Sequence, residues 1–442
     1  MRSLNLLLTS CALLTEYALA SPLAERQYSH GEEGLTVKTN LFTVKGAIFR
    51  NETNVRFFGN IPYAEPPVGH LRFRPPYNSG SKTVYSEYLT GFLLSPGQST
   101  SEDCLTLNVW APAPSKEGSA SPYKYGDRIV RDQNVIVVAL NYRLNIFGFP
   151  KAAALDGHNM NPGLLDQRKA IEWVYENIHA FGGDAAKMTL FGQSMSVDAY
   201  NYAYPFDPLV RGFIAQSGAL GTSSYTFDPT GSNFTYQDEV FTCKQSKPAT
   251  DIISVYNKYN ATLNNGQSLS FGPTADDEVI FSNYTDRQQR GLFAQLPTIY
   301  SSNNAEGSSI LPFTPDGPPG GQTAIDAFTK NFVTCSTANS ALARKTFDVP
   351  VWRVRYFGEW PNLNPFDWMG AYHSADIPMV FDEKATSKCY QGAWIVFAKD
   401  PVNGLVQYGW PTYDPEADTL VKLGNRSVEA VFARGDLFDA GC

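Results

Sequence analysis

The chain has 442 residues, a formal net charge of −8, 43% hydrophobic residues and 18% charged residues. This composition is ordinary for a globular protein that buries a sizeable core. The acidic balance argues against nucleic acid as a partner, because phosphate binding requires a basic face. The aromatic share of 13% fits an apolar pocket, although a thick core uses the same residues.

The first 20 residues predict a secretory signal peptide. A basic start is followed by an apolar run over residues 4–14, and Ala18-Leu19-Ala20 forms a small-x-small cleavage site before Ser21. No later stretch reaches the unbroken apolar length of a membrane span. We therefore expect the mature chain, residues 21–442, to be secreted and extracellular.

Sequons and cysteines agree with an oxidising, extracellular compartment. The N-x-S/T sequons are Asn51, Asn233, Asn260, Asn283 and Asn425. The cysteines beyond the signal peptide are Cys104, Cys243, Cys335, Cys389 and Cys442. Their odd number leaves at least one thiol without an internal partner. Cys335 and Cys389 are a candidate disulfide, but the sequence alone does not fix the pairing.

The central part of the chain alternates between strand and helix patterns. Residues 134–141 form a short β-branched run typical of a buried parallel strand, and residues 165–178 carry apolar side chains at helical spacing. A strand is predicted over residues 187–191 and a helix over residues 197–204. This order is typical of an α/β protein.

A candidate nucleophile lies between that strand and that helix. Gly192, Ser194 and Ser196 give the pattern G-x-S-x-S, one residue away from the G-x-S-x-G turn that exposes a serine hydroxyl at a helix N-terminus. Ser196 is the alternative nucleophile, but no glycine stands two residues before it. We prefer Ser194.

A serine nucleophile requires a base and a residue that orients the base. The candidate bases are His70, His158, His179 and His373. His373 follows the strand-like residues 351–357 by a loop, which is a common place for a catalytic group. With Glu306 as the acid, the chain order Ser194, Glu306, His373 is the order of α/β hydrolases.

Many ordered sequence blocks resemble one family. They are residues 58–69 with 71–73, 101–109, 161–168, 181–184, 216–218, 304–307, 370–378, 397–401 and 409–411. From about Thr36 to the C-terminus, the chain resembles the type-B carboxylesterase/lipase family, which includes the cholinesterases. The amino-acid sequences of these blocks are most similar to those of secreted fungal esterases.

This resemblance implies one α/β-hydrolase domain over residues 21–442, with a mostly parallel central sheet flanked by helices. It also implies hydrolysis of small-molecule or lipid carboxylic esters without a cofactor or metal. Ser194 matches the nucleophile, Glu306 the acid and His373 the base. The remaining matches are Ser217, a supporting residue near the acid, and Arg72 with Glu102, a structural salt bridge.

The chain departs from the family where the oxyanion hole should be. The family has a strand and a Gly-rich loop before the strand that residues 134–141 match, but residues 110–135 contain no Gly-Gly pair and are too few for that strand. We expect a missing sheet strand and a missing oxyanion loop, which leaves the backbone N–H of Met195 as the remaining donor. Each lost donor typically costs about 10²–10³ in rate.

Two further gaps, directly after Ser194 and around residues 243–249, extend this pattern of internal deletions. Their clean edges favour omitted coding segments over gradual divergence. The alternative function is a catalytically silent, cholinesterase-like binding protein. A third possibility, a polysaccharide-binding protein, has less support in the sequence. Retention of the three triad residues favours a damaged ester hydrolase over a repurposed binding protein.

Overall fold

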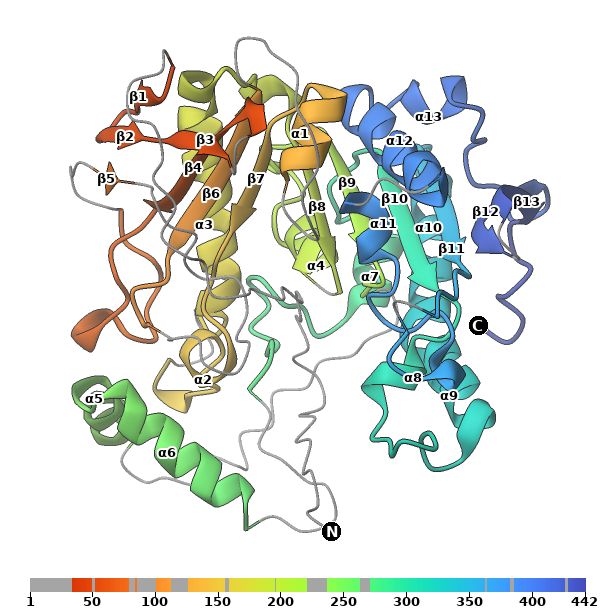
Figure 1. The fold of residues 1–442 in the computed structure, drawn as a ribbon. Coiled ribbons are helices and arrows are strands. Elements are labelled where there is room, and N and C mark those ends of the chain that lie inside the picture. Colours follow the sequence, from red (N-terminus) through yellow and green to blue (C-terminus); the bar gives the residue numbers. More distant parts are fainter. Residues whose placement is uncertain are drawn as a thin grey trace.

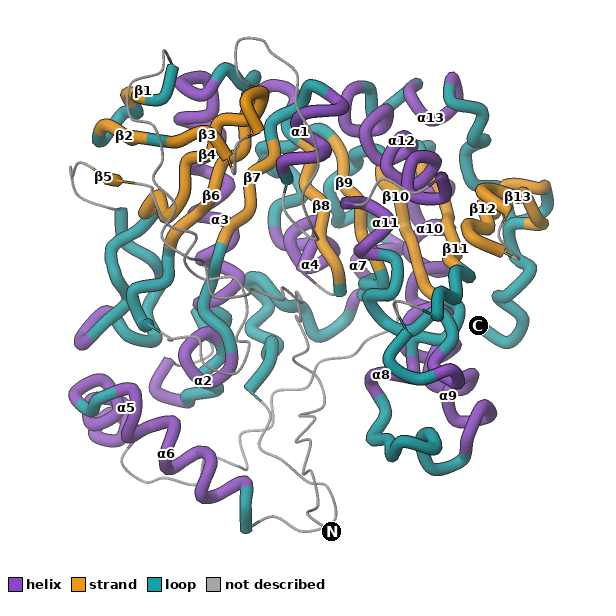
Figure 2. Tube along the Cα trace, in the orientation of Figure 1, coloured by secondary structure: helices purple, strands orange, loops and turns teal. Residues whose placement is uncertain are grey.

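The computed structural model describes most of the chain beyond the N-terminal residues (Figures 1 and 2). The described residues are 34–49, 52–78, 84–85, 101–112, 126–155, 159–194, 196–220, 237–262, 271–361, 364–381, 385–425 and 428–442. The predicted signal peptide lies outside them. None of the described helices combines the length and the apolar character that a bilayer crossing requires.

A six-stranded sheet forms the centre of the C-terminal half. Its order is β13-β12-β11-β10-β9-β8; β8 to β12 run parallel, and β13 pairs antiparallel with β12. The strands are β8 Thr189–Gln193, β9 Gly212–Gln216, β10 Thr298–Asn303, β11 Val351–Tyr356, β12 Asp418–Asn425 and β13 Val428–Arg434. The predicted mostly parallel sheet is confirmed.

Helices cover both faces of this sheet, as the alternation of its side chains requires. In β9, Ile214 packs in a cluster with residues of α1, α11 and α12, whereas its neighbours Phe213 and Ala215 pack in a cluster with residues of α3, α4 and α10. The bounds are α1 Asp127–Gln133, α3 Pro162–Asn177, α4 Ser196–Ala203, α10 Cys335–Thr346, α11 Ile377–Phe381 and α12 Ala385–Lys399.

The remaining helical segments lie mostly around the carboxyl ends of the strands and in the connections. The α-helices are α2 Asn145–Gly148, α5 Gln237–Ser246, α6 Ala249–Asn260, α7 Tyr284–Gln289, α8 Gly307–Ile310, α9 Gly321–Thr329 and α13 Gly404–Gln407. The short turns are η1 Gly69–Leu71, η2 Ala153–Leu155, η3 Ile178–Phe181, η4 Ala185–Lys187, η6 Lys330–Thr334 and η7 Asp367–Met369. In Figure 1, α8 and α9 lie below the ends of β10 and β11.

The N-terminal half contributes two smaller sheets. The four-stranded sheet has the antiparallel order β3-β4-β6-β7, and the three-stranded sheet has the order β1-β2-β5. The strands are β1 Thr36–Lys38, β2 Thr43–Lys45, β3 Ala47–Phe49, β4 Glu52–Pro62, β5 Val84–Tyr85, β6 Thr106–Pro112 and β7 Val137–Leu140.

In the described part of the chain, the six-stranded sheet and the four-stranded sheet are not joined between β7 and β8. Among the described residues, β7 pairs with β6 and β8 pairs with β9, and no strand lies between them (Figure 1). All five residues of β8 are half-buried, whereas all residues of β9 and β10 are buried. A sheet divided at this point agrees with the missing strand expected before residues 134–141.

The disulfide corrects the sequence-based pairing of Cys335 with Cys389. Cys335, the first residue of α10, is bonded to Cys442, and the two Cα atoms lie 5.0 Å apart. Cys389 is a half-buried free thiol in α12. An ion pair between Arg353 and Asp439 brings the C-terminal residues back against β11, which places Cys442 within reach of α10. The pairing therefore depends on tertiary contacts.

We expect the Cys442→Ser variant to lose about 2–4 kcal/mol of the free energy of unfolding. The bond links residues 107 positions apart, so its removal frees a long loop in the unfolded chain. Urea denaturation of the oxidised protein measures this loss. Cys389→Ser is the matched control, because it removes a free thiol and should cost under about 1 kcal/mol. Equal losses in the two variants would contradict the stabilising role of the bond.

Candidate active site

Ser194 lies on a strained turn directly after β8. Its φ is +66°, a left-handed conformation that non-glycine residues rarely adopt, and its backbone N–H donates to the carbonyl of Gln216 at 2.7 Å. The helix α4 begins two residues later, at Ser196. Strain of this kind is common at active sites. The strand, tight turn and helix predicted around Ser194 are therefore confirmed, whereas Met195 lies outside the described residues.

Glu306 follows β10 at the same edge of the sheet. Its carboxylate is fully buried, and Oε1 accepts a hydrogen bond from the backbone N–H of Asn303 at 2.6 Å. The short helix α8 that starts at Gly307 is held by Thr329, whose Oγ1 accepts from the Gly307 N–H at 3.1 Å. Ser308 also donates to the carbonyl of Met369 at 2.7 Å. These contacts fix Glu306 against the loop that carries His373.

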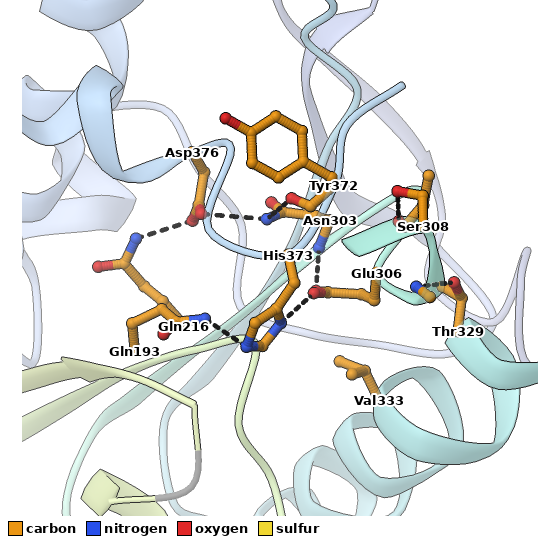
Figure 3. A network of polar contacts seen from close by, with 12 residues as sticks. Gln193, Gln216, Asn303, Glu306, Ser308, Thr329, Val333, Tyr372, His373 and Asp376 are labelled. Carbon is orange, nitrogen blue, oxygen red and sulfur yellow. Dashed lines mark hydrogen bonds and ion pairs between the residues drawn. The ribbon is translucent and has the colours of Figure 1, made fainter. Parts of the chain in front are cut away.

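His373 lies in the loop between β11 and α11, with its side chain buried. Its Nδ1 is 2.5 Å from Oε2 of Glu306 (Figure 3). The parallel bridge between Ala305 and Tyr372 aligns the two loops just before these side chains. Since a carboxylate only accepts, Nδ1 carries the proton and Nε2 carries the lone pair. The structure thus brings together the acid and the base expected from the sequence.

The lone pair of His373 faces Gln193. The Nε2 atom of the Gln193 amide is 2.6 Å from Nε2 of His373, so the amide N–H donates to the ring (Figure 3). Within the described part of the chain, the hydroxyl of Ser194 has no hydrogen bond, to His373 or to any other residue. Glu306 and His373 are therefore in contact, and Ser194 directly follows Gln193, which contacts His373.

A buried carboxylate that the sequence analysis did not single out connects these loops. Asp376 is fully buried and accepts hydrogen bonds from Gln216 at 2.8 Å, Tyr390 at 2.7 Å and Asn303 at 3.1 Å. Burial raises the pKa of the Asp376 carboxyl, and its hydrogen bonds oppose that effect. Asp376 therefore ties the ends of β9 and β10 and helix α12 to the loop of His373. Its place three residues after His373 is the signal that could have identified it.

A buried cation lies close enough to act on Glu306. The side chain of Arg355, in β11, donates to Asn304 at 3.2 Å and to Thr334 at 3.2 Å. Burial lowers the pKa of Arg355 to about 10, and the charge of Glu306 acts in the opposite direction. Arg355 therefore stays charged at neutral pH.

The structure also places the other residues singled out by sequence. Arg72 and Glu102 form the expected ion pair, with two contacts at 2.6 and 2.7 Å. Ser217 is buried after β9 with a φ of +54°, and its hydroxyl has no hydrogen-bond partner among the described residues. His70 and His179 are exposed in η1 and η3.

His158 lies outside the described residues, and nothing is described of the Ser196 side chain. The described part of the chain contains no group of three His, Cys, Asp or Glu residues that could hold a metal ion.

The sequons differ in their surroundings. Asn283 is exposed and caps α7 by accepting from the Asp286 N–H at 2.9 Å, and Asn425 ends β12. Asn260, at the end of α6, is only 8% exposed, and its glycosylation stays a prediction. The sequons at Asn51 and Asn233 lie outside the described residues.

Comparisons with known proteins agree with this fold. Residues 33–322 match the model of the carboxylesterase family. Chlorogenic acid esterase from Aspergillus niger is 33% identical, with 92% of this chain and 94% of the relative covered. Secreted lipase 5 from Gibberella zeae is 32% identical, with 98% of each covered. The chain belongs to the carboxylesterase family.

The solved structure of a PNB esterase is similar over 92% of this chain and 99% of its own, with a TM-score of 0.74 and 26% identity. The fold is therefore that of an α/β hydrolase. The match to the Aspergillus esterase spans 489 aligned positions although this chain has 442 residues, so the relative has residues that this chain lacks. These findings support a carboxylic ester hydrolase.

Proposed function

We propose that this chain is a secreted serine ester hydrolase that acts through Ser194, His373 and Glu306. The contact of His373 Nδ1 with the buried carboxylate of Glu306, beside the strained turn of Ser194, is the observation that supports it. In this mechanism Nε2 of His373 takes the proton of Ser194 as its hydroxyl oxygen attacks the ester carbonyl. The same proton then goes to the leaving alkoxide, and water repeats the sequence on the acyl-enzyme.

The tetrahedral intermediate carries a negative oxygen that requires hydrogen-bond donors. By analogy with the family, the backbone N–H of Met195 is the donor that this chain retains. The Gly-rich loop that supplies two more is missing, and each missing donor typically costs about 10²–10³ in rate. We therefore propose an activity well below that of an intact relative. Its substrates are carboxylic esters, in line with the names of the esterase and lipase relatives.

Secretion and glycosylation belong to the same proposal. The predicted signal peptide over residues 1–20 and the similarity to a secreted lipase support an extracellular protein. Among the described sequons, Asn283 is best placed for a glycan because its side chain is exposed. Asn260, Asn425, Asn51 and Asn233 remain predicted sites. Mature residues 21–442 form the proposed catalytic unit.

We expect Ser194→Ala to abolish labelling by a fluorophosphonate probe and hydrolysis of p-nitrophenyl butyrate. The chain would be expressed in a secreting host, and both rates would be measured beside the parent. Ser196→Ala is the matched control, because it removes the neighbouring hydroxyl and should keep the labelling. Labelling that is lost with Ser196 instead of Ser194 would transfer the nucleophile to Ser196.

A folded, secreted parent that is not labelled would favour the alternative function, a catalytically silent, cholinesterase-like binding protein. The division of the sheet between β7 and β8, where the oxyanion loop of the family would arise, is the observation that favours this alternative.

A further inference from the structure

Both ring nitrogens of His373 are occupied in the structure. Nδ1 contacts Glu306 at 2.5 Å, and Nε2 contacts the amide nitrogen of Gln193 at 2.6 Å. The side chain of His373 is 4% exposed, so water has little access to compete for either contact. Figure 3 shows Gln193 and Glu306 on opposite sides of the ring. The imidazole is therefore clamped between one acceptor and one donor.

The contact with Gln193 uses the atom that the proposed mechanism requires. A neutral imidazole has one lone pair in its plane, and that lone pair accepts one good hydrogen bond. While the Gln193 amide donates to Nε2, the hydroxyl of Ser194 cannot donate to it with good geometry. Gln193 and Ser194 therefore compete for the same site on His373. The Ser194 hydroxyl, which has no hydrogen bond among the described residues, agrees with Gln193 holding that site.

The position of Gln193 allows its side chain to leave without a change in the fold. Its backbone is the last residue of β8 and lies in register with Gln216 of β9. The backbone of Ser194 is in turn held by its hydrogen bond to Gln216. The side chain of Gln193 is half-buried, so rotation of its own χ angles would release Nε2. Exchange between the two partners thus requires one side chain to move.

We propose that Gln193 is a positioning residue that holds the lone pair of His373 in the resting enzyme and withdraws when an ester binds. It thereby sets the fraction of molecules in which Ser194 is activated. This inference rests on the proposed triad. The reaction itself is unchanged: the proton of Ser194 still passes to Nε2 of His373 once the Gln193 amide has moved.

Two substitutions in the full chain test the proposal in opposite directions. Gln193→Met keeps the length of the side chain and removes the donor. It is expected to raise the rate of Ser194 labelling by a fluorophosphonate about two- to tenfold, the population change that one neutral hydrogen bond supports. The KM for p-nitrophenyl butyrate should change less than kcat. Gln193→Glu places an acceptor against Nε2, favours the protonated ring and is expected to slow labelling.

Gln407→Met is the matched control, because Gln407 is exposed in α13 and its substitution should leave the rate unchanged. Labelling of Gln193→Met at or below the parental rate, with an unchanged melting temperature, would overturn the proposal.

A measurement that does not require activity separates this inference from the proposed function. The ¹⁵N chemical shift of His373 Nε2 reports whether that nitrogen accepts a hydrogen bond. We expect it to change in Gln193→Met even if the parent is never labelled. A changed shift in a protein that is never labelled would contradict the proposed esterase activity but support the contact between Gln193 and His373. Gln193 would then be a residue that keeps the base unavailable. An unchanged shift in Gln193→Met overturns the inference whatever the activity.

Discussion

Replacement of Glu306 by glutamine is expected to slow ester hydrolysis by about 10⁴, the loss seen when the acid of a serine triad becomes an amide. Oε2 of Glu306 accepts from Nδ1 of His373 at 2.5 Å, and Oε1 accepts from the Asn303 N–H at 2.6 Å. An amide can present its NH₂ group to the ring, which favours the wrong tautomer. It also provides no charge to stabilise the imidazolium that forms during attack.

Single-turnover labelling and steady-state hydrolysis would both measure this loss. Glu359→Gln is the control, because Glu359 is an exposed carboxylate shortly after β11 and should leave both rates unchanged. The loss should fall on kcat, since Glu306 is buried behind His373 and orients the base. A Glu306→Gln variant with the parental kcat would remove Glu306 from the proposed triad.

The second large effect is on stability. We expect Arg143→Met to lower the free energy of unfolding by about 3–5 kcal/mol, because it leaves a buried carboxylate without its cation. The side chains of Arg143 and Asp166 are 3% and 0% exposed. Arg143 donates to both oxygens of Asp166 at 2.6 and 2.7 Å, and its backbone N–H donates at 3.1 Å. In Arg143→Met the backbone N–H of residue 143 would still donate to Asp166, but the positive charge of the guanidinium would be lost.

A surface ion pair provides the matched control. Arg290 and Asp286 lie 3.1 Å apart with side chains that are 63% and 49% exposed, so Arg290→Met should cost less than about 1 kcal/mol. Urea denaturation would measure both variants. In the Arg143→Met background, Asp166→Asn should recover stability, because it removes the unpaired charge. A loss in Arg143→Met no larger than in the control would contradict a buried pair.

The same variant should show an altered dependence of stability on pH. Burial raises the pKa of Asp166, and Arg143 opposes this effect. Without Arg143, the pKa of Asp166 is higher in the folded protein than in the unfolded chain. The folded protein therefore keeps the Asp166 proton at a pH at which the unfolded chain has released it. The free energy of unfolding should therefore fall as the pH rises above the ordinary aspartate pKa of about 4, relative to the parent. Denaturation at pH 4 and pH 7 would measure the difference.

Local sequence patterns predicted much of the neighbourhood of Ser194. The strand predicted over residues 187–191, the tight turn at Ser194 and the helix predicted over residues 197–204 depend on interactions over a few residues, and the structure has all three as β8, the turn and α4. The chain order of Ser194, Glu306 and His373 also predicted the contact between the last two. Residues 110–135 are too few for the strand that the family has at this point, and among the described residues no strand lies between β7 and β8.

The sequence could not predict the partners that these residues find across the fold. The contact of Gln193 with His373 joins residues 180 positions apart, and Asp376 gathers side chains from β9, β10 and α12. The sequence left the disulfide pairing open and its candidate, Cys335 with Cys389, was wrong, because Cys442 reaches α10 only after the C-terminal segment returns to β11. Such pairings depend on which segments pack side by side, and spacing along the chain does not contain that information.

The sequence by itself determined the family, the parallel α/β architecture and the acid and base of the candidate site, because each is specified by short blocks in a fixed order. The tertiary structure decided which atom the base presents and to which neighbour. Nε2 of His373 faces Gln193 because two loops and the end of β8 meet at this point, and a buried ring nitrogen requires a hydrogen-bond partner. That requirement applies only once the chain has folded.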